Sequence, residues 1–283
     1  MTDMNGKVCI VTGSNSGIGK ETALALAEMG ATVVMAVRDA EKGENARTEI
    51  LEQTGNTKTD LMICDLASLD SIRQFAKEFT QKYDRLDVLV NNAGCTIHKR
   101  QVTNDGFERT LAVNYLGPFL LTHELLPMLK SSAPSRVINL TSGIHSSARV
   151  DFDDLQNERK YRAMNAYGAA KLMVVMYTYE LARRLEGTGV SVNAVHPGFA
   201  ATNLGSNTGA LRHRIMFKMV RPLQISAKKG AETSVYVATS PELEGVTGKY
   251  FAKSEERPSS ELSYDEEAQK RLWVVTEELL GLA

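Results

Sequence analysis

Tyr167 and Lys171 are the residue pair whose types and spacing point most directly to chemistry. They stand in the sequence Tyr-Gly-Ala-Ala-Lys, and residues four apart on a helix project from the same face. A phenol has an ordinary pKa of about 10, too high for ready proton exchange at neutral pH. A nearby ammonium lowers that pKa, so the spacing predicts that Lys171 makes Tyr167 a general acid or base. The same spacing also occurs where a tyrosine packs in a core and a lysine faces solvent, so the surrounding sequence has to decide.

The elements that would position this pair form an alternation of strands and helices. Short apolar, β-branched runs predict buried strands at 7–12, 32–37, 60–64, 86–90, 136–140 and 190–195, with a seventh short strand at 248–252. Amphipathic helices are expected at 20–29, 40–53, 68–83 and 164–185. This alternation predicts an α/β fold over residues 1–283: a single doubly wound domain with a parallel sheet of about seven strands and helices on both faces. Residues 253–263 are expected to form a loop and residues 264–281, approximately, a terminal helix.

The composition indicates a soluble globular protein, with 43% hydrophobic and 24% charged residues. The formal net charge of -1 gives no indication of binding to nucleic acid or to an anionic membrane, which a strongly basic protein would show. Cys9, Cys64 and Cys95 lie far apart without a Cys-x-x-Cys motif, which suits a reduced intracellular protein and predicts no metal site. The first apolar run, 8–11, starts too early for a signal peptide and is too short to span a membrane. The cytoplasm is therefore the expected location.

The first expected strand runs into Thr-Gly-Ser-Asn-Ser-Gly-Ile-Gly at 12–19, and a helix follows. Glycines at a strand-to-helix turn permit unusual backbone angles and let a pyrophosphate approach the main chain. The helix N-terminus then offers free N–H groups and a favourable dipole. The glycine spacing is Gly-x-x-x-Gly-x-Gly, not the common Gly-x-Gly-x-x-Gly. The residues of this turn expected to bind a dinucleotide are Gly13, Asn15, Ser16, Gly17, Ile18 and Gly19.

The end of the second expected strand reports on which dinucleotide is bound. NAD-binding folds place an acidic residue there to hold the ribose hydroxyls, whereas a nearby arginine accommodates the 2′-phosphate of NADP. Here Val37 fills the acidic position and Arg38 follows it, and a guanidinium can bind a phosphate through two hydrogen bonds. We therefore expect NADP(H). Asp39 keeps an alternative open, because its carboxylate could serve NAD or pair with Arg38.

Seven sequence landmarks occur in order along the chain: Thr-Gly-x-x-x-Gly-Ile-Gly at 12–19, Cys64-Asp65-Leu66, Asn91-Asn92-Ala93-Gly94, Asn114, Thr141-Ser142, Tyr167-x-x-x-Lys171, and Pro197-Gly198 with Thr202. In these landmarks and their separations the chain resembles the short-chain dehydrogenase/reductase family, whose fold is of the Rossmann type. Within that family it is similar to the branch of retinol dehydrogenases and carbonyl reductases. The resemblance covers essentially the whole chain.

The resemblance implies a catalytic set of Asn114, Ser142, Tyr167 and Lys171. Ser142 would hydrogen-bond the substrate carbonyl and stabilise charge that develops on its oxygen; Thr141 is the alternative hydroxyl. Asn114 would hold a water that links Lys171 to solvent, and it could also bend its helix ahead of Gly117. A hydrolase site built on Ser142 and His145 is not favoured, because no Gly-x-Ser-x-Gly motif surrounds the serine.

The resemblance also assigns cofactor contacts. Asp65 would accept a hydrogen bond from the adenine amino group, and residues 92–94 would line the adenosine ribose. Pro197 would pack by the nicotinamide, and Thr202 would bond its carboxamide. With the glycine turn and Arg38, the cofactor set is completed by Asp65, Leu66, Asn92, Ala93, Gly94, Tyr167, Lys171, Pro197, Gly198 and Thr202.

The implied activity is NADP(H)-dependent hydride transfer between the nicotinamide and an apolar aldehyde or ketone, or the corresponding alcohol, with retinal and retinol as candidates. Residues 199–225, approximately, are expected to form a substrate lid, whose apolar side chains favour an apolar substrate. The basic amphipathic part, 205–223, has two other interpretations: contact with a membrane surface or ordinary surface packing. An NAD-linked alcohol or steroid dehydrogenase and a non-catalytic NADP-binding sensor are the alternative functions. Related enzymes are often dimers or tetramers, so a homo-oligomer is compatible with the resemblance.

Overall fold

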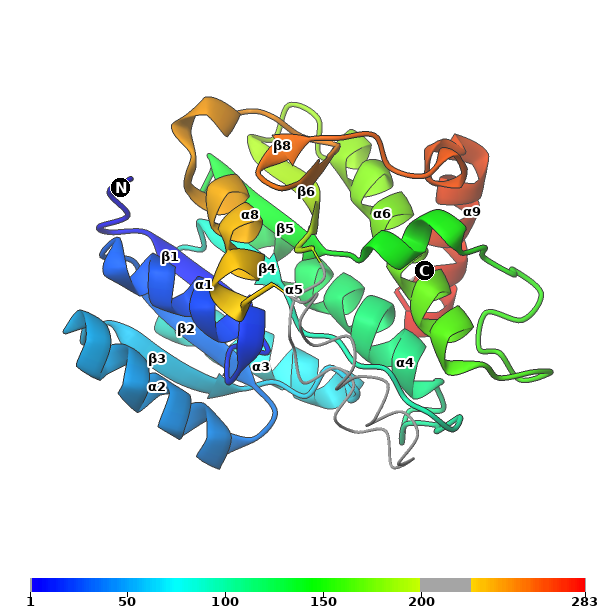
Figure 1. Ribbon diagram of the computed structural model, residues 1–283, viewed down its shortest axis with the longest axis horizontal. Coiled ribbons are helices and arrows are strands. Elements are labelled where there is room, and N and C mark those ends of the chain that lie inside the picture. The colour runs from blue at the N-terminus through cyan, green and yellow to red at the C-terminus, as the bar shows by residue number, and fades with distance from the viewer. Residues whose placement is uncertain (1, 199–224, 283) are drawn as a thin grey trace.

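The computed structural model describes residues 2–198 and 225–282, and an eight-stranded sheet forms its centre (Figure 1). The strand order is β3-β2-β1-β4-β5-β6-β7-β8. β1 to β7 are parallel, and β8 pairs antiparallel with β7. The order reverses between β1 and β4, which creates a switch point of the kind that binds ligands in open α/β sheets. The strands are β1 (Val8–Thr12), β2 (Thr32–Val37), β3 (Thr59–Ile63), β4 (Val88–Asn91), β5 (Ser135–Leu140), β6 (Val190–His196), β7 (Lys249–Ala252) and β8 (Glu255–Glu256).

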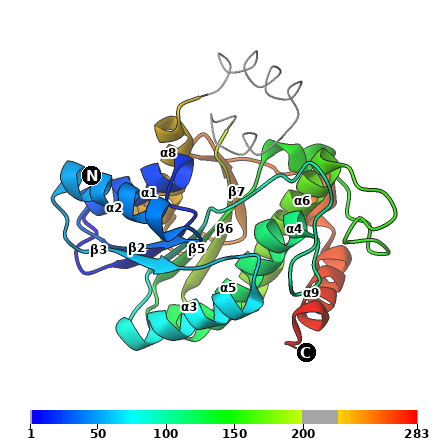
Figure 2. The ribbon, with the colours of Figure 1, turned by 90° about the horizontal axis from the view of Figure 1, so that it is seen from below.

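Helices cover both faces of the sheet (Figure 2). One apolar core joins the strands to α1 (Gly17–Glu28), α2 (Ala40–Thr54) and α8 (Ala227–Thr239). The core on the other face joins them to α3 (Leu69–Lys82), α5 (Gly117–Ser131) and α6 (Ala163–Arg184), with α9 (Glu266–Leu280) packed against α6. All five residues of β1 are buried, as expected for a parallel strand that is covered on both sides.

The helix α6 is buried on nearly all sides because it lies between the sheet and α9. Its residues from Ala170 to Ala182 are buried without interruption, because apolar side chains occur on every side of this part of the helix rather than on one stripe. At its far end, the Arg184 guanidinium lies 4.1 Å from the ring centre of Trp273 on α9. Tyr167 and Lys171 therefore stand on a rigid, well-packed element.

The observed elements confirm the predicted α/β fold, and the predicted strands and helices begin and end within three residues of the observed ones. The prediction of a loop over 253–263 is wrong in part. Lys253 and Ser254 adopt positive φ angles of 55° and 58°, and this turn sends the chain back as β8, which is followed by a 3-10 turn at Glu261–Tyr264. A two-residue strand of glutamates is the kind of short, charged strand that protects a sheet edge from further pairing. The expected lid, apart from Ile225, lies outside the described residues.

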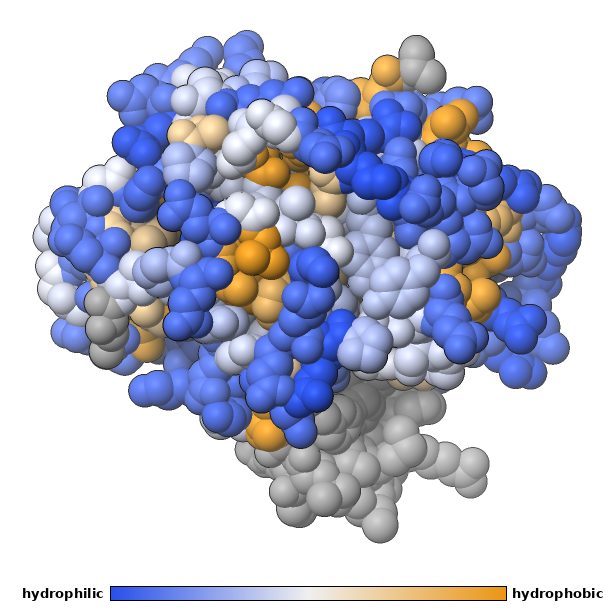
Figure 3. Space-filling model, turned by 90° about the horizontal axis from the view of Figure 1, so that it is seen from above, coloured by the Kyte–Doolittle hydropathy of each residue, from blue (hydrophilic) through white to orange (hydrophobic). Residues whose placement is uncertain are grey.

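The face of the molecule that Figure 3 shows is mainly hydrophilic. In Figure 3, the face seen from above shows apolar side chains only in small, separate groups among charged and polar ones. Among the helices of residues 2–198 and 225–282, none combines the length and the hydropathy that a membrane span requires.

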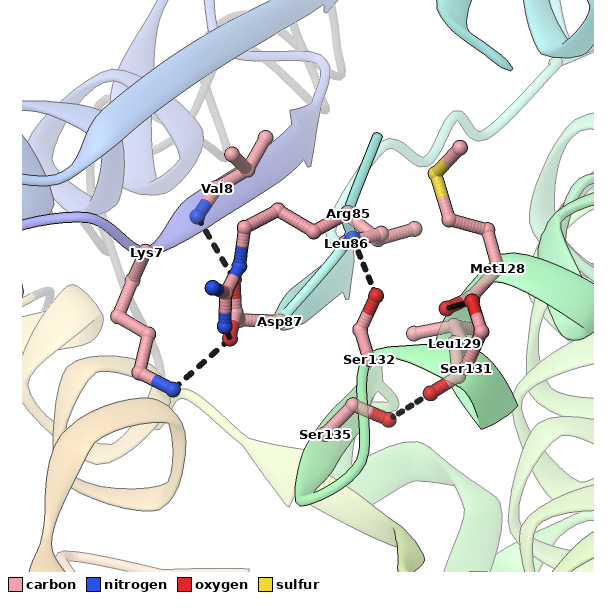
Figure 4. Close-up of polar contacts among 10 residues, drawn as sticks. All are labelled: Lys7, Val8, Arg85, Leu86, Asp87, Met128, Leu129, Ser131, Ser132 and Ser135. Atoms are coloured by element: carbon pink, nitrogen blue, oxygen red, sulfur yellow. Dashed lines mark hydrogen bonds and ion pairs between the residues drawn. The ribbon is translucent and has the colours of Figure 1, made fainter. Parts of the chain in front are cut away.

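Four residues at the amino ends of β1 and β4 form what we call the Asp87 cluster: Lys7, Val8, Arg85 and Asp87 (Figure 4). Asp87 Oδ1 accepts hydrogen bonds from Lys7 Nζ at 2.9 Å and Arg85 Nη2 at 2.6 Å. Its Oδ2 accepts from the main-chain N–H of Val8 at 2.9 Å and from Arg85 Nε at 2.8 Å. Burial acts to raise the pKa of Asp87, but these hydrogen bonds outweigh it and hold the pKa below its ordinary value. The cluster joins the two central strands through a fully paired carboxylate.

Candidate functional site

The carboxyl ends of β1, β4, β5 and β6 bring most predicted site residues to one edge of the sheet. These strands are parallel neighbours, so the segments that follow them lie side by side. They carry the glycine turn after β1, Asn92 after β4, Ser142 after β5 and Pro197 after β6. This edge includes the switch point between β1 and β4, where a doubly wound sheet binds its ligand.

The glycine turn after β1 has the backbone that the sequence predicts. Gly13 and Gly17 adopt φ angles of 66° and 58°, in the left-handed region that favours glycine. A Cβ on Gly19 would lie 2.4 Å from Asn92 Nδ2 and 2.5 Å from the carbonyl oxygen of Gly13, so no side chain fits there. Ser16 stands at the N-cap of α1 without a side-chain capping hydrogen bond, which leaves N–H groups of the first turn available to an anion.

Thr12 is a positioning residue that the sequence analysis missed. Its hydroxyl accepts hydrogen bonds from the main-chain N–H groups of Asn92 at 2.9 Å and Ala93 at 3.0 Å. The amide of Asn92 in turn donates to the carbonyl oxygen of Thr12 at 2.7 Å. The segment after β4 is thereby tied to the start of the glycine turn. The signal in the sequence was a hydroxyl residue at the last position of the first strand, directly before a glycine.

Arg38 and Asp39 have different surroundings at the end of β2. Asp39 Oδ1 accepts the main-chain N–H of Lys42 at 3.1 Å and so caps α2, and its Oδ2 lies 2.5 Å from Lys42 Nζ. The hydrogen bonds from Lys42 lower the pKa of Asp39. Arg38 is exposed, and within residues 2–198 and 225–282 its guanidinium forms no hydrogen bond or ion pair. Asp39 is therefore engaged with its own helix rather than with Arg38.

Asp65 and Leu66 follow β3, on the far side of β2 from the glycine turn. Asp65 Oδ1 accepts the main-chain N–H of Ala67 at 3.0 Å, and its own N–H donates to Ser71 Oγ at 2.9 Å. Leu66 is 5% exposed. A Cβ on Gly117 would lie 2.6 Å from the carbonyl oxygen of Leu66, so this glycine permits α5 to approach the β3 loop closely.

Tyr167 is buried, and the Ser142 side chain lies near enough to influence the pKa of its phenol. Burial raises the pKa of Tyr167 to about 12, against the opposing effect of the Ser142 side chain. The prediction that Lys171 lowers this pKa stays a prediction, because burial of the phenol dominates the net shift. The Lys171 ammonium lies 5.8 Å from the centre of the tyrosine ring, and desolvation of the phenolate outweighs every interaction that favours it.

Lys171 is 4% exposed, and its Nζ donates to the main-chain oxygen of Leu140 at 2.9 Å. Burial lowers the pKa of Lys171 to about 8, and within the described part of the chain it forms no ion pair. The neighbouring hydroxyl of Thr141 donates to the main-chain oxygen of Lys171 at 2.7 Å. Thr141 thus holds α6 to β5, and the hydroxyl that faces Tyr167 belongs to Ser142.

Asn114 lies in a π-helical turn, Ala112–Leu116, between the short helix α4 (Arg109–Leu111) and α5. This irregular turn confirms the expected distortion ahead of Gly117. Asn114 Nδ2 donates to the main-chain oxygens of Cys95 at 2.8 Å and Thr110 at 2.7 Å, and its Oδ1 accepts the N–H of Cys95 at 3.2 Å. A Cβ on Gly94 would lie 2.8 Å from that Oδ1 and 3.5 Å from Lys171 Nζ. Asn114, Gly94 and Lys171 are therefore in close proximity.

His145 does not form a hydrolytic triad with Ser142. Its Nδ1 lies 2.8 Å from the main-chain oxygen of Ser142, and its Nε2 accepts the N–H of Ser260 at 3.2 Å. The imidazole is thus directed at the backbone of the serine and not at its hydroxyl. A nucleophilic serine would need that hydroxyl to face its base.

The end of β6 places Pro197 and Gly198 next to the same edge. Gly198 has a φ of 82°, and a Cβ there would lie 2.9 Å from Ile225 Cδ1. Thr202 lies outside the described residues. In the ranges 2–198 and 225–282, no group of three His, Cys, Asp or Glu side chains is arranged to hold a metal ion.

Comparison with known proteins matches residues 7–212 to the short chain dehydrogenase family. A curated relative, retinol dehydrogenase 13 of Mus musculus, is 47% identical over 283 residues and covers 98% of this chain and 85% of its own length. The chain belongs to the short-chain dehydrogenase family. It is accordingly a dehydrogenase/reductase enzyme, and the sheet edge described above is its candidate active site.

Solved structures of other proteins agree with this family. A crystal structure of an uncharacterized protein from Mycobacterium Paratuberculosis matches this dehydrogenase with a TM-score of 0.80 and 31% identity, over 99% of this chain and 96% of that one. The Pseudomonas aeruginosa RhlG/NADP active-site complex matches with a TM-score of 0.71 and 26% identity (88% and 95%). The 3-ketoacyl-(acyl-carrier-protein) reductase of Brucella melitensis, complexed with NADH, matches with a TM-score of 0.67 and 26% identity (88% and 96%).

Proposed function

We propose that this short-chain dehydrogenase is an NADP(H)-dependent reductase of apolar aldehydes and ketones. The observation that carries the proposal is the convergence of Ser142, Tyr167 and Lys171 at the carboxyl edge of the sheet, with the Ser142 side chain near enough to Tyr167 to influence the pKa of its phenol. A hydroxyl donor beside a protonated phenol suits stabilisation and protonation of a substrate oxygen. A non-catalytic NADP sensor would need the glycine turn but not this set of side chains.

The residues present fit a dinucleotide. The left-handed glycines and the uncapped start of α1 suit a pyrophosphate. The unpaired Arg38 beside an Asp39 that already caps α2 suits a 2′-phosphate rather than ribose hydroxyls. When bound, NADPH would supply the hydride. The neighbouring solved structures hold NADP in one case and NADH in another, so the preference for NADP rests on Arg38.

The chain's own residues would position and protonate the substrate. Ser142 would donate a hydrogen bond to the carbonyl oxygen and orient it toward Tyr167. Tyr167, with a pKa of about 12, stays protonated at neutral pH and can act as the acid. This protonation state favours the reducing direction, because oxidation would require the phenolate as a base. Lys171 would bind the nicotinamide ribose, pass a proton to the Tyr167 phenolate that each reduction leaves, and take up a proton from solvent in its turn.

A small cavity lined by Asn114 and Leu140 is the place that we propose for the water that links Lys171 to solvent. It has a volume of about 10 Å³ and is lined by residues that include Asn114, Leu140, Asn91 and Asn139, which is close to the minimum for one water. The amide oxygen of Asn91 is buried there without a hydrogen-bond partner, and Leu140 carries the carbonyl that binds Lys171. Because the side chain of Asn114 is fully engaged with Cys95 and Thr110, its main-chain oxygen is the atom we assign to this water.

The substrate class is proposed from the relatives. The 47% identical mouse protein is named a retinol dehydrogenase, which favours a retinal- or retinol-like substrate. The apolar residues expected in the lid agree with this choice, as does the possibility of peripheral membrane contact. An NAD-linked alcohol or steroid dehydrogenase is the second candidate. A cytoplasmic location and a homo-oligomer remain predictions.

The first test is turnover by the purified full chain. Reduction by NADPH is measured as the chromatographic yield of the alcohol product from retinal, from a panel of apolar aldehydes and ketones, and from a polar sugar aldehyde as the control substrate. We expect apolar carbonyls to be reduced at higher kcat/KM than the polar one. Tight NADPH binding without turnover of any substrate would instead support the sensor.

The second test concerns Arg38. Arg38→Ala should weaken NADPH binding by about 10- to 100-fold, since a charge-assisted, bidentate phosphate contact is lost. NADH lacks the 2′-phosphate, so its Kd should change less than about twofold. Arg47→Ala, which removes a cation that already pairs with Glu44, is the matched control. Equal or tighter binding of NADH than NADPH by the wild type would contradict the assignment.

A further inference from the structure

The peptide group between Ser142 and Gly143 is held by two imidazole rings, one on each of its polar atoms. Its carbonyl oxygen lies 2.8 Å from His145 Nδ1, and its N–H donates to His196 Nδ1 at 3.2 Å. His145 belongs to the 3-10 turn Gly143–Ser147 after β5, and His196 is the last residue of the neighbouring strand β6. Two different elements therefore fix the backbone that carries the Ser142 hydroxyl.

These partners determine the protonation of both rings. His196 Nδ1 accepts an N–H, so its proton resides on Nε2. His145 Nδ1 faces a carbonyl oxygen while Nε2 accepts the N–H of Ser260 at 3.2 Å, so its proton resides on Nδ1. Each ring thus has to be neutral. Burial lowers the pKa of both histidines, and the nearby His145 lowers that of His196 further.

Packing fixes the His145 ring in place. The residue is 3% exposed, and its ring centre lies 5.1 Å from that of Tyr250 on β7. Ser260, which binds its Nε2, directly precedes the 3-10 turn Glu261–Tyr264. The absence of a side chain at Gly143 matters on the other side, because a Cβ there would lie 3.1 Å from His196 Nε2. A continuous chain of contacts therefore runs from the C-terminal segment to Ser142.

We propose that His145, held by the main-chain N–H of Ser260, is a positioning residue that directs the Ser142 hydroxyl toward Tyr167 and the substrate oxygen. This proposal rests on the proposed role of Ser142 in binding the substrate oxygen. We call the His145 ring, the His196 ring and the peptide between Ser142 and Gly143 the clamp. The Ser142 side chain is attached next to this peptide, so rotation of the peptide displaces the hydroxyl. A misplacement of about 1 Å in a reacting group can cost about 100-fold in rate. His145 itself does not touch the reacting atoms.

The clamp also predicts a loss of activity in acid. Within residues 2–198 and 225–282, the titratable groups that face the two rings are the rings themselves and Tyr250. Proton uptake by either ring turns its accepting nitrogen into a donor that faces another N–H, so a hydrogen bond is replaced by repulsion. Because both pKa values lie below the ordinary value, kcat should decline only below about pH 6.5.

Ser260 offers a matched pair of variants. Its φ is −70°, which proline adopts without strain, so Ser260→Pro removes the N–H that binds His145 Nε2. Ser260→Ala keeps this N–H and removes only a hydroxyl that is buried without a partner. We expect Ser260→Pro to lower kcat roughly tenfold, the effect of about one hydrogen bond, and to change the acid limb of the pH profile. Ser260→Ala should stay within about twofold of the wild type, and NADPH should bind both variants equally.

His145 variants keep the inference testable if Ser260→Pro fails to fold. His145→Phe preserves the ring contact with Tyr250 but loses both hydrogen bonds, and kcat should fall roughly 10- to 100-fold. His145→Asn places an amide N–H at the position of Nδ1, so it should recover a large part of that loss. Equal kcat values for the phenylalanine and wild-type proteins, both shown to be folded by circular dichroism, would overturn the proposal.

A measurement independent of turnover separates this proposal from the proposed function. Two-dimensional ¹H–¹⁵N NMR of the histidine rings should show the Nδ1–H tautomer for His145 and the Nε2–H tautomer for His196. If no carbonyl is reduced by the wild type, the proposed function fails, while the tautomers still decide whether the rings hold the Ser142 peptide. An Nε2–H tautomer of His145 would refute the clamp even in an active enzyme.

Discussion

Buried titratable side chains have opposite surroundings at the two ends of the central strands: many hydrogen-bond partners at the amino ends and few at the carboxyl ends. At the amino ends, Asp87 is 3% exposed and receives four hydrogen bonds, from Arg85, Lys7 and the main chain of Val8. At the carboxyl ends, Lys171 is 4% exposed, and among residues 2–198 and 225–282 its Nζ has one hydrogen-bond partner, the carbonyl oxygen of Leu140. The surroundings of Asp87 lower its pKa and favour its charged form, whereas burial disfavours the charged forms of both Lys171 and Tyr167.

This difference separates stability from function within one sheet. A buried charge that is fully paired holds elements together, and removing one partner is costly. A buried titratable group with few partners costs stability, and such groups are typical of active sites. The amino end therefore explains how β1 and β4 are joined, and the carboxyl end explains where protons can be exchanged. The comparison predicts that mutations at the two ends change different measured quantities.

Tyr167→Phe should have the largest effect, and it should act on the rate alone. Loss of the proton donor should lower kcat/KM by about 10²- to 10⁴-fold, the usual contribution of general acid catalysis. The free energy of unfolding should change by less than about 1 kcal/mol, since the aromatic ring and its packing remain. NADPH oxidation and urea unfolding measure the two quantities. More than a tenth of the wild-type kcat/KM in the variant would remove Tyr167 from the role of acid.

Asp87→Asn should show the reverse behaviour. The amide cannot accept four hydrogen bonds or balance two cations, so the free energy of unfolding should fall by about 2 to 4 kcal/mol. The kcat of the folded enzyme should remain within about twofold of the wild type, because the cluster lies at the opposite edge of the sheet. Asp84→Asn, which makes the same charge change at an exposed position, is the control for urea unfolding at pH 7. A large fall in kcat at full folding would break the separation between the two ends.

The pH dependence of the free energy of unfolding tests whether Lys171 at the carboxyl end is desolvated. The unfolded chain keeps the Lys171 proton up to a pKa of about 10.5, whereas the folded protein releases it at about 8. Between these values the unfolded state binds more protons, so the free energy of unfolding rises with pH. Above about pH 10, Tyr167 acts in the opposite direction, because its folded pKa is raised. The useful window is therefore pH 8 to 10.

The Lys171→Met variant lacks the contribution of Lys171 to the free energy of unfolding, which in the wild type rises with pH in this window. The free energy of unfolding of the wild type, minus that of the variant, should increase by about 1 to 3 kcal/mol from pH 8 to pH 10. Lys160→Met removes an exposed lysine and should show no such increase. Parallel profiles for the wild type and Lys171→Met would mean that Lys171 is not desolvated in the folded protein.

Local sequence patterns could predict the strands, the helices and the meeting of the site residues. Parallel strands end at one edge, so the glycine turn, Asn92 and Ser142 had to converge once the alternation of elements was recognised. The short β8 was missed because it depends on two positive φ angles and on pairing with β7. Neither requirement leaves a periodic pattern in a two-residue strand.

The electrostatics of the site could not be predicted, because they depend on residues distant in the chain. The spacing of Tyr167 and Lys171 gave their common helix face but not the burial that raises the pKa of the phenol. His145 looked like a candidate base, yet its partner Ser260 lies 115 residues later. The pairing of Asp87 could not be predicted from its neighbours in the sequence, since its hydrogen bond to Val8 spans 79 residues.

Thr141 provides the smallest effect and the closest comparison, because it stands next to Ser142 at the same strand end. Its hydroxyl is buried and donates to the main-chain oxygen of Lys171, so Thr141→Val should lower the free energy of unfolding by about 1 kcal/mol. It should leave kcat within about fivefold, whereas Ser142→Ala should lower kcat by about 10²- to 10³-fold. Both values come from urea unfolding and NADPH oxidation on the same preparations. If the two variants lost activity equally, the oxygen-binding role could not be assigned to Ser142 alone. Thr141 would then not be limited to holding α6, and the two adjacent hydroxyls would not have separate roles.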